Sequence, residues 1–441
     1  MEISPFRGIR FNQRIVVDLD RVLCPPYDVM TPEEQRVCYS RSDYNAVRLE
    51  SPAQNSQSTT DGYQRASTTF RQWLKQGILQ FDSTPSFYLH DHHFEYSGEK
   101  RVRRGLVTRV RLEPWGSGIY AHEETSARAR IDRLQLMRAC RASFSPLLCL
   151  YYGSRREVAL ISSRVAQTEP LVSLPPTQSS LADSAEAHVV WAITDVEIIL
   201  QLTRSLSFDR LYIADGHHRY ETALTYQQER TKAQVGSNSP STIVHEVNQS
   251  PLGQEAFNYV MMELVDFTDP GLVILPLHRL VRDIRPTVLA QLRDRLREIF
   301  VLNSIPLEGD NYELPANSCL GILGLEHGSL VALRQRGGIS LHTMMPMNRG
   351  QAYRQFNVSI LNHIILDKML GVTSKDDVAY TVDLKQAYWY IKEGKYQLAF
   401  LLNAPRPEMI RAVADAQDRL PSKSTYFYPK LPAGLIINPL D

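Results

Sequence analysis

Cysteine is scarce in this sequence, and its placement excludes two common uses of the residue. The 441 residues include five cysteines, at Cys24, Cys38, Cys140, Cys149 and Cys319. Their number is odd and no two form a Cys-x-x-Cys pair, so we expect neither a disulfide framework nor a structural zinc site made of cysteines. Reduced thiols are typical of the cytosol, and we therefore expect a cytoplasmic protein.

Long hydrophobic runs and a net charge are also missing. Nowhere do about 18 consecutive apolar residues occur, and the segment Met1 to Arg7 lacks a basic stretch followed by an apolar one. We therefore expect neither a membrane span nor export. The 49 Lys and Arg residues against 48 Asp and Glu residues give a formal charge of +1. No global basic field exists to hold a nucleic-acid backbone, so nucleic acid is not an expected partner.

The familiar nucleotide and catalytic motifs are absent as well. The sequence has no Walker A loop, no Gly-x-Gly-x-x-Gly after a strand, no Gly-x-Ser-x-Gly elbow and no protein-kinase signature set. Any nucleotide that binds is expected to use a less common arrangement.

The overall composition is that of a globular protein. Hydrophobic residues make up 43% and charged residues 22% of the chain, which argues against wholesale disorder. The length exceeds what one hydrophobic core usually serves. We predict an N-terminal α/β region of residues 1–281 that carries the site and a smaller C-terminal α/β subdomain of residues 282–441, with the boundary near Arg282.

Segments typical of strands and of helices alternate along the chain, which predicts mixed α/β layers. The predicted strands are residues 86–89, 104–112, 189–193, 210–213, 319–323 and 397–402. The predicted helices are residues 63–77, 218–230, 286–300, 353–370, 384–393 and 407–420. Polar stretches at residues 51–61, 170–184 and 231–242 are predicted to be loops.

The segment from Ala214 to Tyr220, Ala-Asp-Gly-His-His-Arg-Tyr, is the strongest candidate for a functional site. A strand ending near Ile213, a turn at Asp215 and Gly216, and a helix that starts at once would place His217, His218 and Arg219 in the first helical turn. Unpaired N–H groups and the helix dipole make such a turn an anion site. Asp215 is a candidate magnesium ligand, and a histidine is a candidate proton donor. The alternative is purely structural: Asp215 caps the helix, one histidine packs against the sheet, and Arg219 pairs with a neighbouring carboxylate.

A second candidate is His122-Glu123-Glu124-Thr125, followed by Asp132-Arg133. These polar residues follow a predicted strand, and a carboxylate there can act as a general base towards a substrate hydroxyl. A capping cluster at the start of the next helix explains the same residues, and from the pattern alone we favour it.

Two further segments are candidates for binding. Pro25 and Pro26 stiffen the backbone before Tyr27 and Asp28, which favours either a presented binding turn or simple rigidity. Between residues 421 and 430, hydroxyls and ammonium groups suited to phosphate alternate with aromatic residues. The polar members of this segment are Lys423, Ser424, Thr425 and Lys430. An edge strand guarded by lysine is the simpler interpretation.

His90 and His92 would share one face of a strand, as metal ligands can. Surface strands often display such pairs, so we do not predict a metal site there.

Taken in order, these segments resemble the bacterial and archaeal family known as domain of unknown function 1015, over nearly the whole chain. The resemblance is carried by Pro25 to Val29, Asn45 with Val47 to Leu49, His122-Glu123 with Thr125, Asp132-Arg133, Ala214 to Tyr220, Pro276 with His278-Arg279, and Lys423 to Thr425 with Phe427 and Pro429-Lys430. Since the family is uncharacterised, the resemblance implies little about activity.

The shorter segment Asp215-Gly216-His217-His218-Arg219 is similar to the Asp-Gly-His-His-Arg segment of archaeal free-serine kinases of the ParB/sulfiredoxin superfamily. That resemblance implies a ParB/sulfiredoxin-like site region and phosphoryl transfer between ADP or ATP and free serine. It further implies that Glu123 is the base, that Asp215 binds Mg²⁺, and that His217, His218 and Arg219 hold phosphates. About ninety residues separate Glu123 from Asp215, so an insertion must lie between them.

Three hypotheses follow. The leading one is a phosphotransferase or phosphohydrolase acting on free serine or phosphoserine with a nucleotide. The second is a non-catalytic nucleotide-binding or ParB-like regulatory module, and the third is a structural protein whose motifs are only turns and caps. The sequence leaves the oligomeric state open.

Overall fold

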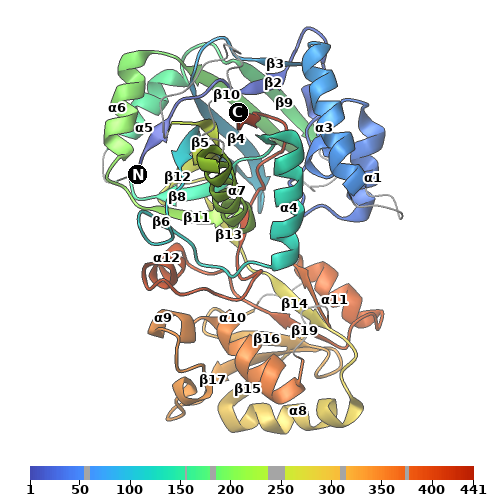
Figure 1. Ribbon diagram of the computed structural model, residues 1–441. Coiled ribbons are helices and arrows are strands. Elements are labelled where there is room, and N and C mark those ends of the chain that lie inside the picture. Colours follow the sequence, from blue (N-terminus) through green and yellow to red (C-terminus); the bar gives the residue numbers. More distant parts are fainter. Residues whose placement is uncertain (54–59, 154–155, 179–184, 237–253, 308–313, 373–376) are drawn as a thin grey trace. The chain divides into compact units, whose positions relative to one another are not determined.

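The computed structural model (Figure 1) describes residues 1–53, 60–153, 156–178, 185–236, 254–307, 314–372 and 377–441. The chain divides into two compact units. Unit 1 contains Met1–Tyr120, Thr125–Leu272 and Pro429–Asp441, and unit 2 contains Ala121–Glu124 and Val273–Tyr428. The predicted domain boundary near Arg282 lies inside unit 2, directly after the strand His278–Val281. The division into domains 1–281 and 282–441 remains a prediction.

Unit 1 is built on a nine-stranded sheet with the order β6-β11-β8-β12-β5-β4-β10-β9, in which β1 pairs with β5. Its strands are β1 (Ile3–Ser4), β4 (Phe87–Tyr96), β5 (Glu99–Arg111), β6 (Ile119–Tyr120), β8 (Leu147–Tyr151), β9 (Val172–Gln178), β10 (Ala185–Ile193), β11 (Leu211–Asp215) and β12 (Tyr259–Asp266). The β4–β5 hairpin turns at Ser97 and Gly98, whose φ values of 52° and 79° suit a tight two-residue turn.

Unit 1 also contains helices. They are α1 (Pro32–Arg41), α2 (Val47–Glu50), α3 (Thr60–Lys75), α4 (Ala127–Cys140), α5 (Arg156–Val165), α6 (Val196–Leu206) and α7 (His217–Gly236). Helices α3, α4 and α7 lie side by side (Figure 1). The short elements of unit 1 are β2 (Ile9–Phe11), η1 (Leu19–Arg21), β3 (Leu79–Phe81), β7 (Ala142–Ser143), η2 (Ala256–Asn258) and β21 (Asn438–Pro439).

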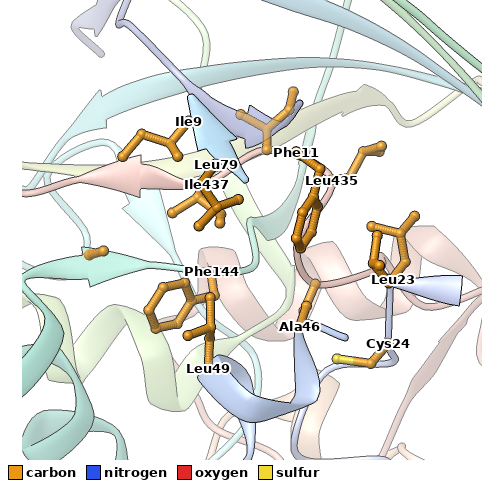
Figure 2. Packing of buried hydrophobic residues seen from close by; sticks show 14 of the residues in the cluster. Ile9, Phe11, Leu23, Cys24, Ala46, Leu49, Leu79, Phe144, Leu435 and Ile437 are labelled. Carbon is orange, nitrogen blue, oxygen red and sulfur yellow. The ribbon is translucent and has the colours of Figure 1, made fainter. Parts of the chain in front are cut away.

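Both ends of the chain contribute to the core of unit 1. Figure 2 shows Ile9 and Phe11 near the start of the chain packed with Leu435 and Ile437 near its end. The Ile9 and Ile437 backbones exchange two hydrogen bonds, each with an N–O distance of 2.9 Å. The last residues therefore belong to unit 1, which brings Lys430 into it.

Unit 2 contains a six-stranded antiparallel sheet with the order β15-β17-β16-β19-β14-β18. Its strands are β14 (His278–Val281), β15 (Phe300–Pro306), β16 (Leu320–Leu323), β17 (Ser329–Gln335), β18 (Val378–Thr381) and β19 (Leu398–Leu401), beside the separate pair β13 (Val273–Leu275) and β20 (Tyr426–Tyr428). Its helices are α8 (Pro286–Ile299), η3 (Leu341–Met344), α9 (Gln351–Arg354), α10 (Asn357–Ile360), the π-helix η4 (Leu361–Leu370), α11 (Leu384–Lys392) and α12 (Pro407–Asp415).

The mixed α/β prediction is confirmed, with corrections in detail. The predicted loop 170–184 contains strand β9, and the predicted loop 231–242 begins inside α7, because tertiary pairing and helix continuation outweighed polar composition. The predicted helix 353–370 is divided into α9, α10 and the π-helix. Parts of the three predicted loops, residues 54–59, 179–184 and 237–242, lie outside the described residues. Among the described residues, no helix has the length and apolar character needed to cross a membrane.

Candidate functional site

The turn between β11 and α7 has the predicted strand–turn–helix form. Strand β11 ends at Asp215 and α7 begins at His217. Gly216 between them has a φ of +95°, which only glycine adopts without strain. A Cβ there would also lie 2.8 Å from Cγ of Leu147. The turn is therefore tight, and its glycine is required by both backbone and packing.

Asp215 is held between two cationic side chains within unit 1. Its Oδ2 accepts a hydrogen bond from Arg219 at 2.9 Å, one helical turn along α7. Its Oδ1 is paired with the ammonium group of Lys430. Lys430 comes from the C-terminal segment, so residues 215 positions apart meet here. The structure thus brings together three predicted site residues, Asp215, Arg219 and Lys430.

Arg219 is fixed from several directions. Besides Asp215, one guanidinium nitrogen donates to Oγ of Ser145 at 2.9 Å and to the carbonyl of Pro146 at 2.7 Å. Burial alone would lower the pKa of Arg219, but the acidic groups around it, with Asp215 and Asp28 the strongest, raise the pKa above its usual value. The guanidinium therefore stays charged and positions Asp215.

The residues around Asp215 do not fit a magnesium ion. Mg²⁺ prefers carboxylate oxygens together with several waters in a nearly octahedral arrangement. Both carboxylate oxygens of Asp215 contact cationic nitrogens, from Arg219 and Lys430. A second cation at the same carboxylate would be repelled by both. No chemical step is therefore assigned to magnesium.

The first turns of α4 and α7 adjoin each other beside this network. The Ser126 N–H donates to Nε2 of His218 at 2.9 Å, which places the proton of a neutral His218 ring on Nδ1. The hydroxyl of Thr125 donates to Glu221 at 2.6 Å. His217 is buried and His218 half-buried. Two helix dipoles thus have their positive ends close together, which favours an anion.

A second set of contacts surrounds Tyr27. The guanidinium of Arg133 lies 3.8 Å from the centre of the Tyr27 ring, and the Tyr27 N–H donates to Glu50 at 3.4 Å. The Tyr27 hydroxyl is buried without a hydrogen-bond partner among the described residues. Burial, followed by the nearby Asp28, raises the pKa of Tyr27. A polar atom of this kind suits a ligand or an ordered water.

Ser145 joins the two sets. Its hydroxyl accepts from Arg219 and donates to Glu50 at 3.1 Å. Beside it lies a small pocket. The pocket is lined by the polar residues Glu50, Arg133, Ser143, Ser145 and Arg219 and by the apolar residues Leu136, Met137, Ala142, Phe144, Leu147 and Val260. Sequence reasoning missed Glu50 and Ser145, because their burial depends on which distant segments cover them.

Glu123 lies in unit 2 and holds the segment Lys423 to Thr425. Its Oε1 accepts from the Ser424 N–H at 3.0 Å and from the N–H and hydroxyl of Thr425, each at 2.8 Å. Its Oε2 accepts from the Lys423 N–H at 3.1 Å. The Thr425 hydroxyl is also 2.9 Å from Nε2 of His122. These bonds stabilise a loop in which Lys423 has a φ of +63°.

The predicted site residues therefore fall into two groups. Unit 1 holds Tyr27, Asp28, Thr125, Asp215, Gly216, His217, His218, Arg219 and Lys430, and unit 2 holds His122, Glu123, Lys423, Ser424 and Thr425.

The interpretation of His90 and His92 as a surface pair is wrong. Both side chains are at most 1% exposed, because side chains of neighbouring strands contact them and the C-terminal segment lies against this face.

A family model described as "Protein of unknown function (DUF1015)" matches residues 3–391. No curated protein sequence matches the chain. Among solved structures, a free serine kinase in complex with AMP is 10% identical, with 73% of this chain and 86% of that chain covered and a TM-score of 0.36. A conserved hypothetical protein from Pyrococcus furiosus is 11% identical, with 74% and 93% covered and a TM-score of 0.34. SbnI with a C-terminal truncation, from Staphylococcus aureus, is 10% identical, with 73% and 82% covered and a TM-score of 0.31.

Proposed function

The chain belongs to the DUF1015 family of proteins of unknown function, and we propose that it binds a small phosphorylated compound at the start of α7. Most concretely, the proposal is a phosphotransferase or phosphohydrolase acting on free serine or phosphoserine, with ADP or ATP as the nucleotide. The choice of serine rests on the Asp215 to Arg219 segment, which resembles that of free-serine kinases. The ParB/sulfiredoxin-like character of this region belongs to the same proposal.

The observation that carries the proposal is the Lys430–Asp215–Arg219 arrangement at a helix N-terminus. Arg219 is locked by Ser145 and Pro146, whereas a lysine ammonium sits on a flexible stem with three rotatable donors. An incoming phosphate competes with Asp215 for Lys430 and gains the N-terminal dipole of α7. Binding would thus move Lys430 from Asp215 to the phosphate.

Departure of Lys430 would release Oδ1 of Asp215 from this ion pair while Arg219 keeps Oδ2. The released oxygen would then accept the proton of the substrate hydroxyl as the hydroxyl oxygen bonds to phosphorus. The bond from that phosphorus to the bridging oxygen of the nucleotide would break in the same step, so that ATP leaves as ADP, or ADP as AMP. His218, whose Nε2 already accepts from Ser126, would donate its Nδ1–H to a phosphoryl oxygen. Glu123 remains a proposed base, but it would first have to release the Lys423 to Thr425 segment.

A thermal-shift screen tests the binding step. ADP, ATP, L-serine and phosphoserine are each added to the full chain with and without magnesium. We expect a phosphorylated ligand to raise the melting temperature of the wild type and of Lys75→Gln, an exposed lysine of α3, and the rise to be lost in Lys430→Gln. No shift in the wild type, or the same shift in Lys430→Gln, would contradict the proposal.

A non-catalytic nucleotide-binding or regulatory module is the second candidate. It is favoured by the engagement of both candidate bases, Asp215 by two cations and Glu123 by four hydrogen bonds. An assay for transfer of labelled phosphate from ATP to serine distinguishes the phosphotransferase from the non-catalytic module. The module would bind the nucleotide but transfer no phosphate. A ParB-like DNA-binding version predicts a gel shift at low salt, which the formal charge of +1 does not favour.

A further inference from the structure

A buried group of three imidazoles lies on one face of the unit 1 sheet, and the proposed function does not use it. His90 and His92 project from β4, and His188 projects from β10 directly opposite His92 in the strand register. The exposed fractions of these residues are 1%, 0% and 7%. Burying this many polar rings is costly unless each has a partner, so the partners define what the group can do.

A hydrogen-bond relay crosses four neighbouring strands and orients His188. Oε2 of Glu263 on β12 is 2.8 Å from Nδ1 of His90, and Nε2 of His90 is 3.1 Å from Nδ1 of His188. The Glu263 carboxylate accepts the Nδ1–H of His90, so the lone pair of a neutral His90 ring is on Nε2. That nitrogen accepts the Nδ1–H of His188, which leaves the lone pair of His188 on Nε2. Gly105 makes the relay possible, because a Cβ there would lie 2.4 Å from Cγ of Glu263.

The oriented ring faces two other donor groups. Nε2 of His92 is 2.8 Å from Oε2 of Glu186, which lies two residues before His188 on β10. The ring centres of His92 and His188 are 4.2 Å apart. One potential ligand atom from each of His92, Glu186 and His188 lies within 4.8 Å of the other two.

We propose that His92, His188 and Glu186 bind one divalent transition-metal ion, and that zinc is the ion these donors suit best. Two imidazoles and one carboxylate are a common three-ligand set for zinc, which leaves a fourth position for water or a small ligand. The Glu263–His90–His188 relay resembles the outer-shell carboxylate–histidine arrangement that orients metal-bound imidazoles, with His90 between the carboxylate and the ligand ring. Metal binding at Nε2 of His92 requires the ring proton to move to Nδ1, so the Arg103 guanidinium that donates to Nδ1 must turn away from it. This inference is independent of the proposed phosphate site.

The charges around the group accommodate a cation. The guanidinium of Arg103 is buried and lies 3.2 Å from Nδ1 of His92. Acidic groups, among them Glu263, Asp269 and Glu186, oppose the charge of Arg103.

Zinc content of the full chain is the first test. The protein is stripped with a chelator, equilibrated with zinc, passed through a desalting column and analysed by mass spectrometry for metal. We expect about one zinc per wild-type chain, retained in His93→Gln, the next residue of β4 on the opposite face. We expect the zinc to be lost in His188→Gln and in Glu186→Gln. Glu263→Gln should weaken binding by about 10- to 100-fold.

The second test uses Co²⁺ on the wild type, because a ligand variant can fail to fold. A four-coordinate site of nitrogen and oxygen donors absorbs visible light far more strongly than hydrated Co²⁺. An intense spectrum that added zinc abolishes supports the site. A wild type that retains no zinc, a weak Co²⁺ spectrum, or a folded His188→Gln variant with undiminished zinc would each overturn the proposal.

Discussion

At the scale of single residues, Gly216 determines where Asp215 and Arg219 point. Its φ of +95° and the 2.8 Å that would separate an added Cβ from Cγ of Leu147 both oppose any side chain. We expect Gly216→Ala to lower the free energy of unfolding by about 2 to 4 kcal/mol. Gly98→Ala, where φ is 79° and the Cβ position is open, should cost only about 1 kcal/mol. Urea unfolding measures both, and equal losses would show that packing against Leu147 is unimportant.

His278 makes the stability of the chain depend on pH. It is 1% exposed on β14, and burial, followed by the neighbouring Arg279, lowers its pKa from 6.5 to about 4. The unfolded chain therefore binds the proton first as pH falls. The stability contribution is complete above pH 6.5 and is lost between there and about pH 4.

We expect about 2 kcal/mol of this stability to be lost at pH 5. Replacing the ring in His278→Asn should remove that part of the pH dependence, although the variant is less stable at every pH. His327→Asn, at an exposed position, should leave the wild-type pH dependence intact. Urea unfolding midpoints at pH 7 and pH 5 provide the comparison. If the midpoint of His278→Asn falls between pH 7 and pH 5 by as much as that of the wild type, the assignment to His278 is refuted.

At the scale of elements, the Glu123 carboxylate holds the segment that leads into β20. Three backbone N–H groups and one hydroxyl, from Lys423, Ser424 and Thr425, donate to it. Glu123→Ala leaves these donors unpaired, so we expect a loss of about 2 to 4 kcal/mol in unfolding free energy. The neighbouring Glu124 makes a partly exposed ion pair with Arg349, and Glu124→Ala should cost under about 1 kcal/mol.

Hydrogen exchange of peptides from residues 421–428 locates the effect. Faster exchange there in Glu123→Ala, but not in Glu124→Ala, supports the holding role. Equal exchange in the two variants would show that the segment is kept in place without Glu123.

Local elements could be predicted from the sequence, and long-range partners could not. The β11–Gly216–α7 turn was predictable because alternation, a glycine and a helical pattern all lie within one short segment. Nothing near Asp215 in the sequence indicates Lys430. The burial of His90 and His92 was likewise missed, since an alternating polar strand is typical of a surface until the elements that cover it are known. The loop prediction for residues 170–184 failed for the same reason at β9.

At the scale of the whole molecule, the C-terminal segment completes unit 1. Pro429–Asp441 is assigned to that unit, Leu435, Ile436 and Ile437 are buried in its core, and Gly434 donates to the Phe144 carbonyl at 2.9 Å. The segment that supplies Lys430 to Asp215 is therefore also a structural part of the unit. Loss of the segment and loss of the Lys430 ammonium should have different consequences.

Deleting residues 431–441 should destabilise unit 1 although Lys430 is kept. Each lost Leu or Ile removes about 2 to 5 kcal/mol, and three such losses approach the roughly 5 to 15 kcal/mol that typically stabilises a domain. Hydrogen exchange should show lost protection in β8, β11 and α7, whereas deletion of the exposed Asp441 alone should change little. Protection that persists in unit 1 would contradict this role. Loss that extends equally through the sheet of unit 2 would instead show that the two units unfold together, because an independent unit 2 has no reason to respond to a deletion in unit 1.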